Sequence, residues 1–416
     1  MRILKQAVWV SLSLGIVVSL CWQARLAPAA TMTEQNLKWH SGVLDADIPV
    51  TVFVPDNSAS GKPLATVVYL KNLSVPRIGQ DSDDDIIADL LKDGTLVIAL
   101  DYAKSPKAVA GVLNPDFLKI RDELEGKKFL ADYKIDPNHT YILAEGFRIK
   151  RDVVFYKEPK RTLAMDIQYP AHPIHPVPTL MEITCDNTNR WGAGSAIFCH
   201  DTMIDGGMLA GFAGAMIDEP VDPPYKGFDD PMPGVIYRLK AAVRTLRKTA
   251  PTLGLSEKIG AIGFSRGATL AGILETTEDR ADLEGDGPNQ GVSSDVQAIL
   301  THGQRYDYLD LLKDDPMLPR FTKKWGDVKD KQDFWAAHGA MYYLPKDKTH
   351  MPPIFFDTSD AEQPAYRYGM ERFSKKLGEM GVDQHYQVDK DGRGHHFSLD
   401  PKTLEDIYAF FGKNLN

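Results

Sequence analysis

The sequence predicts a mixed α/β fold in which a mostly parallel sheet is flanked by helices. Residues 258–262 are a short apolar run, followed by a glycine-flanked turn and by the small and apolar residues 268–274, which indicates a strand, a turn and a helix in succession. Residues 96–101 and 352–356 are further apolar runs of strand length. Residues 83–91 place apolar side chains at helical spacing after three aspartates, which favour a helix N-terminus.

The first 29 residues have the features of a cleavable signal peptide. Arg2 and Lys5 give a positive start, residues 7–20 are an uncharged apolar stretch, and small residues precede position 30. The apolar stretch is shorter than the roughly 20 residues that a membrane-spanning helix needs. We therefore expect cleavage, no membrane anchor afterwards, and a secreted or periplasmic protein.

Export would place the chain in an oxidising compartment. Cys185 and Cys199 are the only cysteines beyond the signal peptide, with 13 residues between them. We expect these two residues to form a disulfide bond, and a pair of buried free thiols is the alternative.

Residues 30–145 predict an α/β extension that precedes a larger domain at 146–416. The extension has the order strand, strand, helix, strand, and a similar order recurs after residue 160. We therefore expect the extension to be a partial duplication that resembles half of the larger domain. The paired segments are 50–55 with 163–170, 65–70 with 179–184, and 96–101 with 213–218.

Ser265 lies in the sequence Gly263-Phe264-Ser265-Arg266-Gly267, between the predicted strand and the predicted helix. A G-x-S-x-G turn in this context is typical of a nucleophile elbow, where the serine takes a strained backbone conformation and the flanking positions must be glycine. The alternative is a loop serine between two glycines. The strand before the motif and the helix after it favour the nucleophile.

Charge and motifs exclude several other functions. The formal net charge is -9, and no basic stripe interleaved with aromatics is present, so we expect no nucleic-acid partner. No glycine-rich nucleotide motif, HExxH or CxxC occurs, and the acidic runs at 81–85 and 282–287 lack the ligands that complete a calcium loop. We expect no cofactor and no metal ion.

From Arg151 onward the chain resembles the α/β-hydrolase superfamily, in particular secreted carboxylesterases of the acetyl-xylan esterase, feruloyl esterase and dienelactone hydrolase type. The resemblance rests on the elbow around Ser265, the strand at 352–356 and the loop at 391–397, which contains Gly392-Arg393-Gly394-His395. It implies an α/β-hydrolase fold and a triad in the chain order serine, acid, histidine.

The resemblance assigns the triad to Ser265, Asp360 and His395. A carboxylate orients the histidine, and the histidine accepts the proton of the serine hydroxyl. Asp357 and Asp307 are alternatives for the acid, and His396 is the alternative for the histidine.

The oxyanion hole has one clear candidate donor, the backbone amide of Arg266. The second donor normally comes from the loop after the third strand, where this chain has Asp186 and Asn187 in place of the glycines of many esterases. The Arg266 side chain could stabilise the oxyanion, as in the glucuronoyl esterases that this Ser-Arg pair resembles, or pair with a carboxylate.

These features together predict an exported serine hydrolase that cleaves carboxylic esters through an acyl-serine intermediate. Because no lid-like apolar segment is evident, we expect short-acyl or carbohydrate-linked substrates rather than long-chain lipids. The alternatives are a serine peptidase of the prolyl-oligopeptidase type and a catalytically inactive binding module with the same fold.

Overall fold

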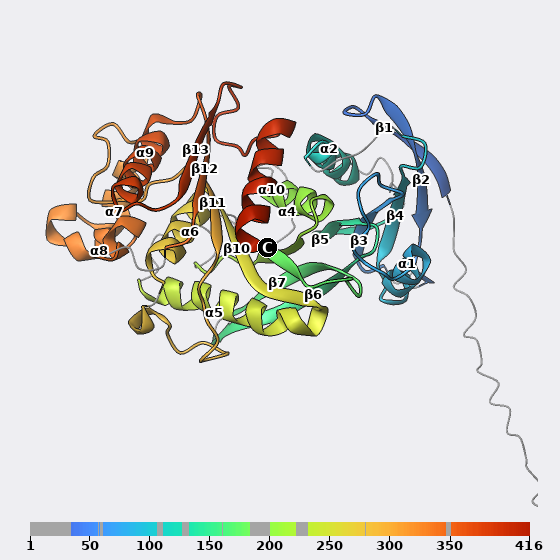
Figure 1. Cartoon of the computed structure of the whole chain (residues 1–416), viewed down its shortest axis with the longest axis horizontal. Helices are drawn as coiled ribbons and strands as arrows, with labels where there is room; N and C mark the ends of the chain where they lie inside the picture. Colours follow the sequence, from blue (N-terminus) through green and yellow to red (C-terminus); the bar gives the residue numbers. More distant parts are fainter. Residues whose placement is uncertain are drawn as a thin grey trace, which may run out of the picture. The chain divides into compact units, whose positions relative to one another are not determined.

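Two β-sheets, which follow one another along the chain, form the framework of the protein (Figure 1). A computed structural model describes residues 35–416, apart from 57, 59, 60, 106–110, 127–132, 160, 184–199, 222–231, 279 and 347–350. The predicted signal peptide at 1–29 therefore lies outside the described residues. Within the described part of the chain, we find no helix with the length and apolar character needed to cross a membrane.

The first sheet, sheet A, has five strands in the order β1-β2-β4-β3-β5. The pairs β1/β2 and β2/β4 are antiparallel, whereas β4/β3 and β3/β5 are parallel. Its strands are β1 (Gln35–Ser41), β2 (Ala46–Phe53), β3 (Leu64–Lys71), β4 (Leu96–Asp101) and β5 (Ile135–Ala144). Helix α1 (Asp83–Lys92) begins at the predicted acidic residues, with Ser82 as its N-cap, and α2 (Asn114–Glu125) precedes β5.

The second sheet, sheet B, has eight strands in the order β13-β12-β11-β10-β8-β9-β7-β6. Among its described pairings, β6/β7 and β7/β9 are antiparallel and the other five are parallel, whereas sheet A has two pairings of each kind. Its strands are β6 (Phe147–Glu158), β7 (Arg161–Pro170), β8 (Val177–Ile183), β9 (Ala213–Ile217), β10 (Leu255–Phe264), β11 (Ala298–His302), β12 (Ile354–Ser359) and β13 (Gln384–Asp389).

The strand order and directions of sheet A recur in the first five strands of sheet B. Strands β1-β2-β4-β3-β5 correspond in turn to β6-β7-β9-β8-β10, with the same two antiparallel and two parallel pairings. The registers also agree, because Leu70 pairs with Leu100 and Ala144, and Ile183 pairs with Ile217 and Gly263.

Helices cover both faces of sheet B. One hydrophobic core contains side chains from sheet A, from one face of sheet B and from the helices between them. A second core lies on the other face of sheet B. The helices of the first core include α4 (His200–Leu209) and α10 (Pro401–Leu415), and those of the second are α5 (Gly234–Thr249), α6 (Arg266–Thr276) and α9 (Pro364–Glu379).

A third, aromatic cluster lies in the connection between β11 and β12. It contains Tyr308, Phe321, Trp325 and Trp335, and two short helices, α7 (Leu318–Trp325) and α8 (Gln332–Ala336), supply most of it. Arg305, at the start of this connection, forms a buried ion pair with Asp315. The connection is therefore a small packed unit at the carboxyl end of β11.

Candidate active site

Ser265 stands at the carboxyl end of β10, where the chain turns into α6. Its backbone has φ 51° and ψ −119°, a left-handed conformation that a residue with a side chain rarely adopts. A Cβ atom on Gly263 would lie 2.4 Å from the carbonyl oxygen of Gly267. The predicted steric requirement for glycine in this turn is therefore confirmed at Gly263, and Ser265 has the backbone of a nucleophile elbow.

Two backbone hydrogen bonds hold the elbow in place. The amide of Ser265 donates to the carbonyl oxygen of His302 at 3.0 Å, and its carbonyl oxygen accepts from Ala268 at 2.9 Å. The first bond ties the elbow to the end of β11, and the second closes the first turn of α6. The strained residue is thus fixed from both sides.

His395 lies beside the elbow. Its ring stacks on Tyr366 at a centroid distance of 4.4 Å and contacts Phe264, the residue before Ser265, at 4.7 Å. Its Nδ1 is 2.8 Å from Oε2 of Glu362, and its Nε2 is buried without a hydrogen bond to any described residue. One ring nitrogen is therefore oriented by a carboxylate, and the other is left for a reacting group.

The carboxylate that contacts His395 is Glu362, two residues after the predicted Asp360. Asp360 is exposed, and its Oδ1 accepts a hydrogen bond from the amide of Gly392 at 3.1 Å. Asp307, another candidate, accepts from the amide of Leu309 at 2.9 Å and pairs with Arg372. Both aspartates thus stabilise turns, whereas Glu362 is buried against the ring.

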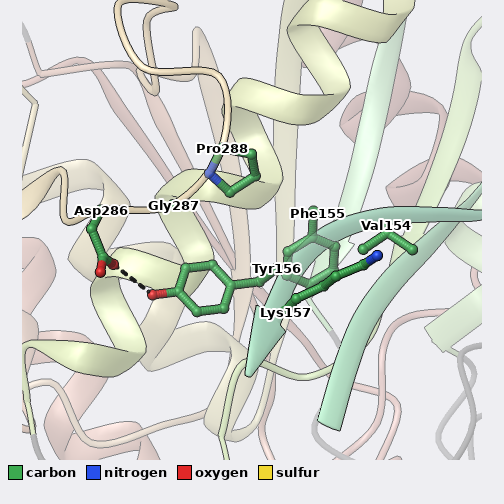
Figure 2. Close-up of a pocket in the computed structure, with 7 residues that line it drawn as sticks. All are labelled: Val154, Phe155, Tyr156, Lys157, Asp286, Gly287 and Pro288. Atoms are coloured by element: carbon green, nitrogen blue, oxygen red, sulfur yellow. Dashed lines mark hydrogen bonds between the residues drawn. The ribbon is translucent and has the colours of Figure 1, made fainter. Parts of the chain in front are cut away.

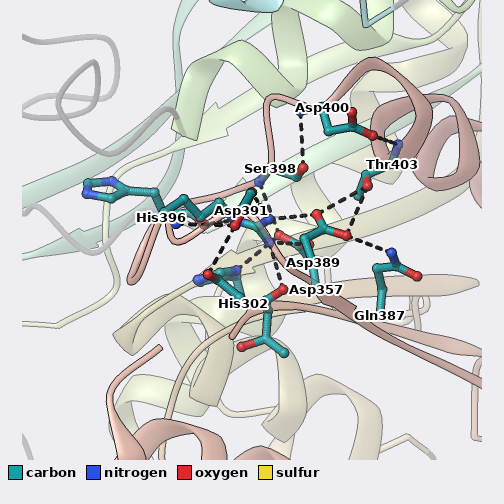
Figure 3. Close-up of polar contacts among 12 residues, drawn as sticks. His302, Asp357, Gln387, Asp389, Asp391, His396, Ser398, Asp400 and Thr403 are labelled. Atoms are coloured by element: carbon teal, nitrogen blue, oxygen red, sulfur yellow. Dashed lines mark hydrogen bonds and ion pairs between the residues drawn. The ribbon is translucent and has the colours of Figure 1, made fainter. Parts of the chain in front are cut away.

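Asp357, the remaining candidate acid, is buried and contacts a histidine that the sequence did not single out. Its Oδ2 is 3.0 Å from Nδ1 of His302, and its Oδ1 accepts from Arg393 at 2.6 Å (Figure 3). Nε2 of His302 lies 3.1 Å from the Glu362 oxygen that also contacts His395. The four groups therefore form a chain, Asp357, His302, Glu362 and His395.

Charges and burial shift the pKa values in this chain. Burial raises the pKa of Glu362, but its hydrogen bonds with His302 and His395 outweigh burial and lower it to about 2. Burial opposes the charged form of His302, yet the hydrogen bonds with Asp357 and Glu362 raise its pKa. Burial is the main reason that the pKa of His395 is lowered. These directions favour the ionised form of Glu362, the charged form of His302 and the neutral form of His395.

Arg393 holds the loop that carries His395. Its guanidinium donates to Asp357, Asp389 and Asp391, in each case at 2.6 Å, and its Nε donates to the carbonyl oxygen of His396 at 2.7 Å. Figure 3 shows the ring of His396 directed away from this cluster. Arg393 therefore acts as a loop anchor, and the loop presents His395 rather than His396 to the elbow.

The predicted oxyanion donors are described only in part. Arg266 begins α6, where the first amides of a helix have no acceptor one turn earlier, so its backbone can face a developing negative charge. Its side chain pairs with the buried Glu219, whose Oε2 lies 2.7 Å from Nη2. Asp186, Asn187 and the predicted disulfide partners Cys185 and Cys199 lie outside the described residues.

Three side chains of this site could be mistaken for metal ligands. One nitrogen or oxygen each from His302, Glu362 and His395 lies within 4.8 Å of the others. Both histidines, however, contact the same oxygen of Glu362 directly, at 3.1 and 2.8 Å. The contact of Glu362 with His395 is a hydrogen bond and that with His302 is an ion pair, so the three side chains are direct partners of one another.

A separate pocket of about 490 Å³ lies along the edge strand β6 (Figure 2). The hydroxyl of Tyr156 donates to Asp286 at 2.9 Å across it, and Gly287 and Pro288 line one side. None of the residues around the elbow lines it, so it belongs to a different part of the molecule.

Comparisons with known proteins give a likeness of fold. No family model matches the chain, and no curated protein matches it in sequence. A truncated carbohydrate esterase from gut microbiota is 20% identical, with a TM-score of 0.51, over 64% of this chain and 96% of that one. A bifunctional GH43-CE protein from Bacteroides eggerthii is 22% identical, with a TM-score of 0.52, over 64% of this chain and 35% of that protein. Over this 64% the chain shares its fold with the two proteins.

Sequence reasoning missed Glu362 and His302. His302 is the last residue of β11 and pairs in register with both Phe264 and Asp357, on the strands to either side. A polar residue at the carboxyl end of a strand that adjoins the nucleophile strand is a signal that could have found it, because parallel strand ends meet at one edge of a sheet.

Proposed function

We propose that the protein is a serine hydrolase of the α/β-hydrolase fold that cleaves carboxylic esters, with Ser265 as nucleophile, His395 as base and Glu362 as the acid. The observation that carries this proposal is the strained elbow at Ser265 beside the His395–Glu362 pair. The order of sheet B, with its second strand antiparallel, supports the fold.

The reaction follows from the roles of these groups. Oγ of Ser265 attacks the ester carbonyl carbon while Nε2 of His395 takes its proton, and Glu362 stabilises the resulting imidazolium. The carbonyl oxygen becomes an oxyanion beside the amide of Arg266, with a second donor proposed in Asp186 or Asn187. The alcohol leaves with the proton from His395. Water, deprotonated by the same ring, then attacks the acyl carbon, and the acid is released as the bond to Oγ of Ser265 breaks and Oγ takes the proton back from His395.

We further propose export after cleavage near residue 29, a Cys185–Cys199 disulfide, and a short-acyl or carbohydrate-linked ester as substrate. The descriptions of the two solved neighbours as carbohydrate esterase and GH43-CE protein support the carbohydrate class. Arg393 and Arg266 both pair with carboxylates of the protein, so they give no support to an acidic substrate.

The test is covalent labelling and turnover of the full mature chain. A fluorophosphonate probe should label Ser265, and Ser265→Ala should lower kcat on short p-nitrophenyl and acetylated sugar esters by about 10⁴-fold or more without changing the thermal midpoint. Ser256→Ala, on the same strand but distant from its carboxyl end, is the control. Labelling with turnover of peptide anilides instead of esters would favour the peptidase, and an unlabelled Ser265 would favour the inactive module.

A further inference from the structure

The network behind His395 extends beyond the usual serine, histidine and acid. Oε2 of Glu362 lies 2.8 Å from Nδ1 of His395 and 3.1 Å from Nε2 of His302, so one oxygen serves two rings. Nδ1 of His302 lies 3.0 Å from Oδ2 of Asp357. His302 thus stands between two carboxylates, and all three of these side chains are buried.

This placement favours one protonation state of His302. A neutral imidazole has one N–H and one lone pair, whereas an ionised carboxylate only accepts hydrogen bonds. A neutral His302 that donated to Asp357 would turn the lone pair of Nε2 toward Glu362 at 3.1 Å. With a proton on each nitrogen, both contacts become attractive. The geometry therefore favours an imidazolium.

The surroundings of His302 balance that charge. The ring stacks on Phe264 at 5.4 Å, with 14° between the planes, and aromatic faces stabilise cations. Asp357 from β12 and Glu362 from the following loop are the two anions that contact it. Arg393 neutralises the other oxygen of Asp357, and His395 and His396 are the remaining titratable groups that interact electrostatically with His302.

We propose that His302 is a positioning residue, a permanent buried imidazolium that fixes Glu362 against His395 and offsets its negative charge, so that His395 stays neutral in the resting enzyme. This inference rests on the proposed function. In a triad with one carboxylate and no further charge, the carboxylate raises the pKa of the histidine that it contacts. Here the second histidine offsets that effect, and the base is free to accept the serine proton at mildly acid pH.

The charge of His302 lowers the pKa of His395, which is the direction that the proposal requires. Burial lowers the pKa of His395, Glu362 raises it, and the positive charge of His302 lowers it. Removal of that charge should therefore raise the pKa of His395. Because His395 must be neutral to act, the acidic limb of kcat/KM should move to higher pH.

Two variants with uncharged side chains separate the effect of the His302 charge from its effect on the orientation of Glu362. His302→Gln can still donate a hydrogen bond toward Glu362, and His302→Asn toward Asp357. Both should move the acidic limb of kcat/KM upward by about one pH unit. His302→Asn should in addition lower kcat at pH 8 by about 10- to 100-fold with little change in KM, because Glu362 is no longer held, whereas His302→Gln should retain more of kcat.

His385→Gln is the matched control, since His385 is an exposed histidine on β13 of the same sheet. Histidine-selective ¹⁵N NMR of the unmodified protein gives a readout that needs no variant. One buried ring should carry protons on both nitrogens at pH 7.

The outcomes distinguish the two proposals. If Ser265 takes the fluorophosphonate label but both folded His302 variants keep the acidic limb of the unmodified enzyme, the role of His302 is refuted and the esterase proposal stands. A neutral ring for every buried histidine at pH 7 would refute it as well. If Ser265 is not labelled, both proposals fall together.

Discussion

Glu362 contacts two rings with one carboxylate oxygen, and this sharing makes it the most informative side chain of the site. It follows β12 by three residues and is buried, although the loop around it is exposed at Asp360. The extra methylene of glutamate lets the carboxylate reach back over the sheet edge, whereas the shorter Asp360 binds the amide of Gly392. We therefore expect replacement by the matching amide to affect kcat very differently at the two positions.

Glu362→Gln should lower kcat by about 10³- to 10⁴-fold, because an amide no longer favours the productive tautomer of His395 or stabilises its imidazolium. Asp360→Asn, the matched change on the same loop, should stay within about threefold of the unmodified enzyme and cost at most about 1 kcal/mol of stability. Steady-state kinetics on a short p-nitrophenyl ester decide between them. A severe loss of kcat in Asp360→Asn with a mild loss in Glu362→Gln would instead identify Asp360 as the acid of the triad.

The pH dependence of activity follows from His395. Burial lowers its pKa below the ordinary value of 6.5, and the ring must be neutral to accept the serine proton. We expect kcat/KM to rise with pH through a midpoint below 6.5 and to be level between pH 7 and 8. A pH–rate profile measured at constant ionic strength tests this. A midpoint above 7, or no acidic limb at all, would contradict His395 as the base.

Residue-level prediction succeeded where the local sequence specifies the backbone. The G-x-S-x-G spacing forces the turn at Ser265, and Gly394 precedes the histidine that the structure brings to the elbow. The contact of the acid depends on side-chain reach across a loop, and that of His302 on the alignment of neighbouring strands. Neither property is encoded in residue spacing, so Glu362 and His302 were missed.

At the scale of elements, the structure extends the predicted strands at their carboxyl ends. β10 continues to Phe264 and β12 to Ser359, beyond the apolar runs that ended at 262 and 356, and β11 between them ends at His302. Polar residues at these ends are buried because they pair in the sheet and bond to one another, as His302 and Asp357 do. A prediction from hydrophobicity alone therefore ends these strands too early, before the polar residues that still pair in the sheet.

Helix α6, which follows Ser265, carries an unusual buried acid. Glu275 is fully buried, and neither carboxylate oxygen has a hydrogen-bond partner among the described residues. Burial, assisted by the nearby charge of Glu278, raises its pKa well above the ordinary value of 4.5. Its contribution to stability is therefore fully present below that ordinary value, and it is lost as the pH rises toward the folded-state pKa.

Glu275→Gln should remove this dependence. We expect the variant to be more stable than the unmodified protein at pH 8, by about 1 to 3 kcal/mol, and to show no such gain at pH 4. Urea unfolding at the two pH values measures the difference, with the exposed Glu405→Gln on α10 as control. A destabilised variant at both pH values would mean that the carboxyl group makes a favourable contact that an amide cannot replace.

At the scale of the whole molecule, sheet A and the first five strands of sheet B share order, direction and register. Counting from the paired residues Ala144 and Gly263, Gly146 occupies the position of Ser265, and its φ of 77° resembles the φ of 51° at the serine. We propose that sheet A is a partial duplication that kept the bend of the elbow but has no nucleophile. The sequence pattern suggested the repeat, and the strand registers give it a residue-by-residue correspondence.

Sheet A and the helices beside sheet B share one hydrophobic core, so the extension at 30–145 is part of the packing around the site. Arg121 on α2 donates to Asp205 on α4 at 2.9 Å, and Asn114 donates to Tyr408 on α10 at 3.3 Å. These bonds join the extension to two helices that pack against sheet B. Removal of the extension would expose apolar faces that water solvates poorly, and would take the partner from a buried ion pair.

Deletion of residues 30–145 should therefore leave a 146–416 fragment that aggregates, although it retains Ser265, Glu362 and His395. Co-expression of the two pieces as separate chains should restore soluble protein and Ser265 labelling, because the shared core can form between chains as well as within one. The measurements are the soluble yield, co-purification of the pieces and kcat/KM of the complex. A soluble 146–416 fragment with the kcat/KM of the intact protein would show that the extension is an independent appendage, since a fold that needs the shared core cannot retain its active-site geometry without it.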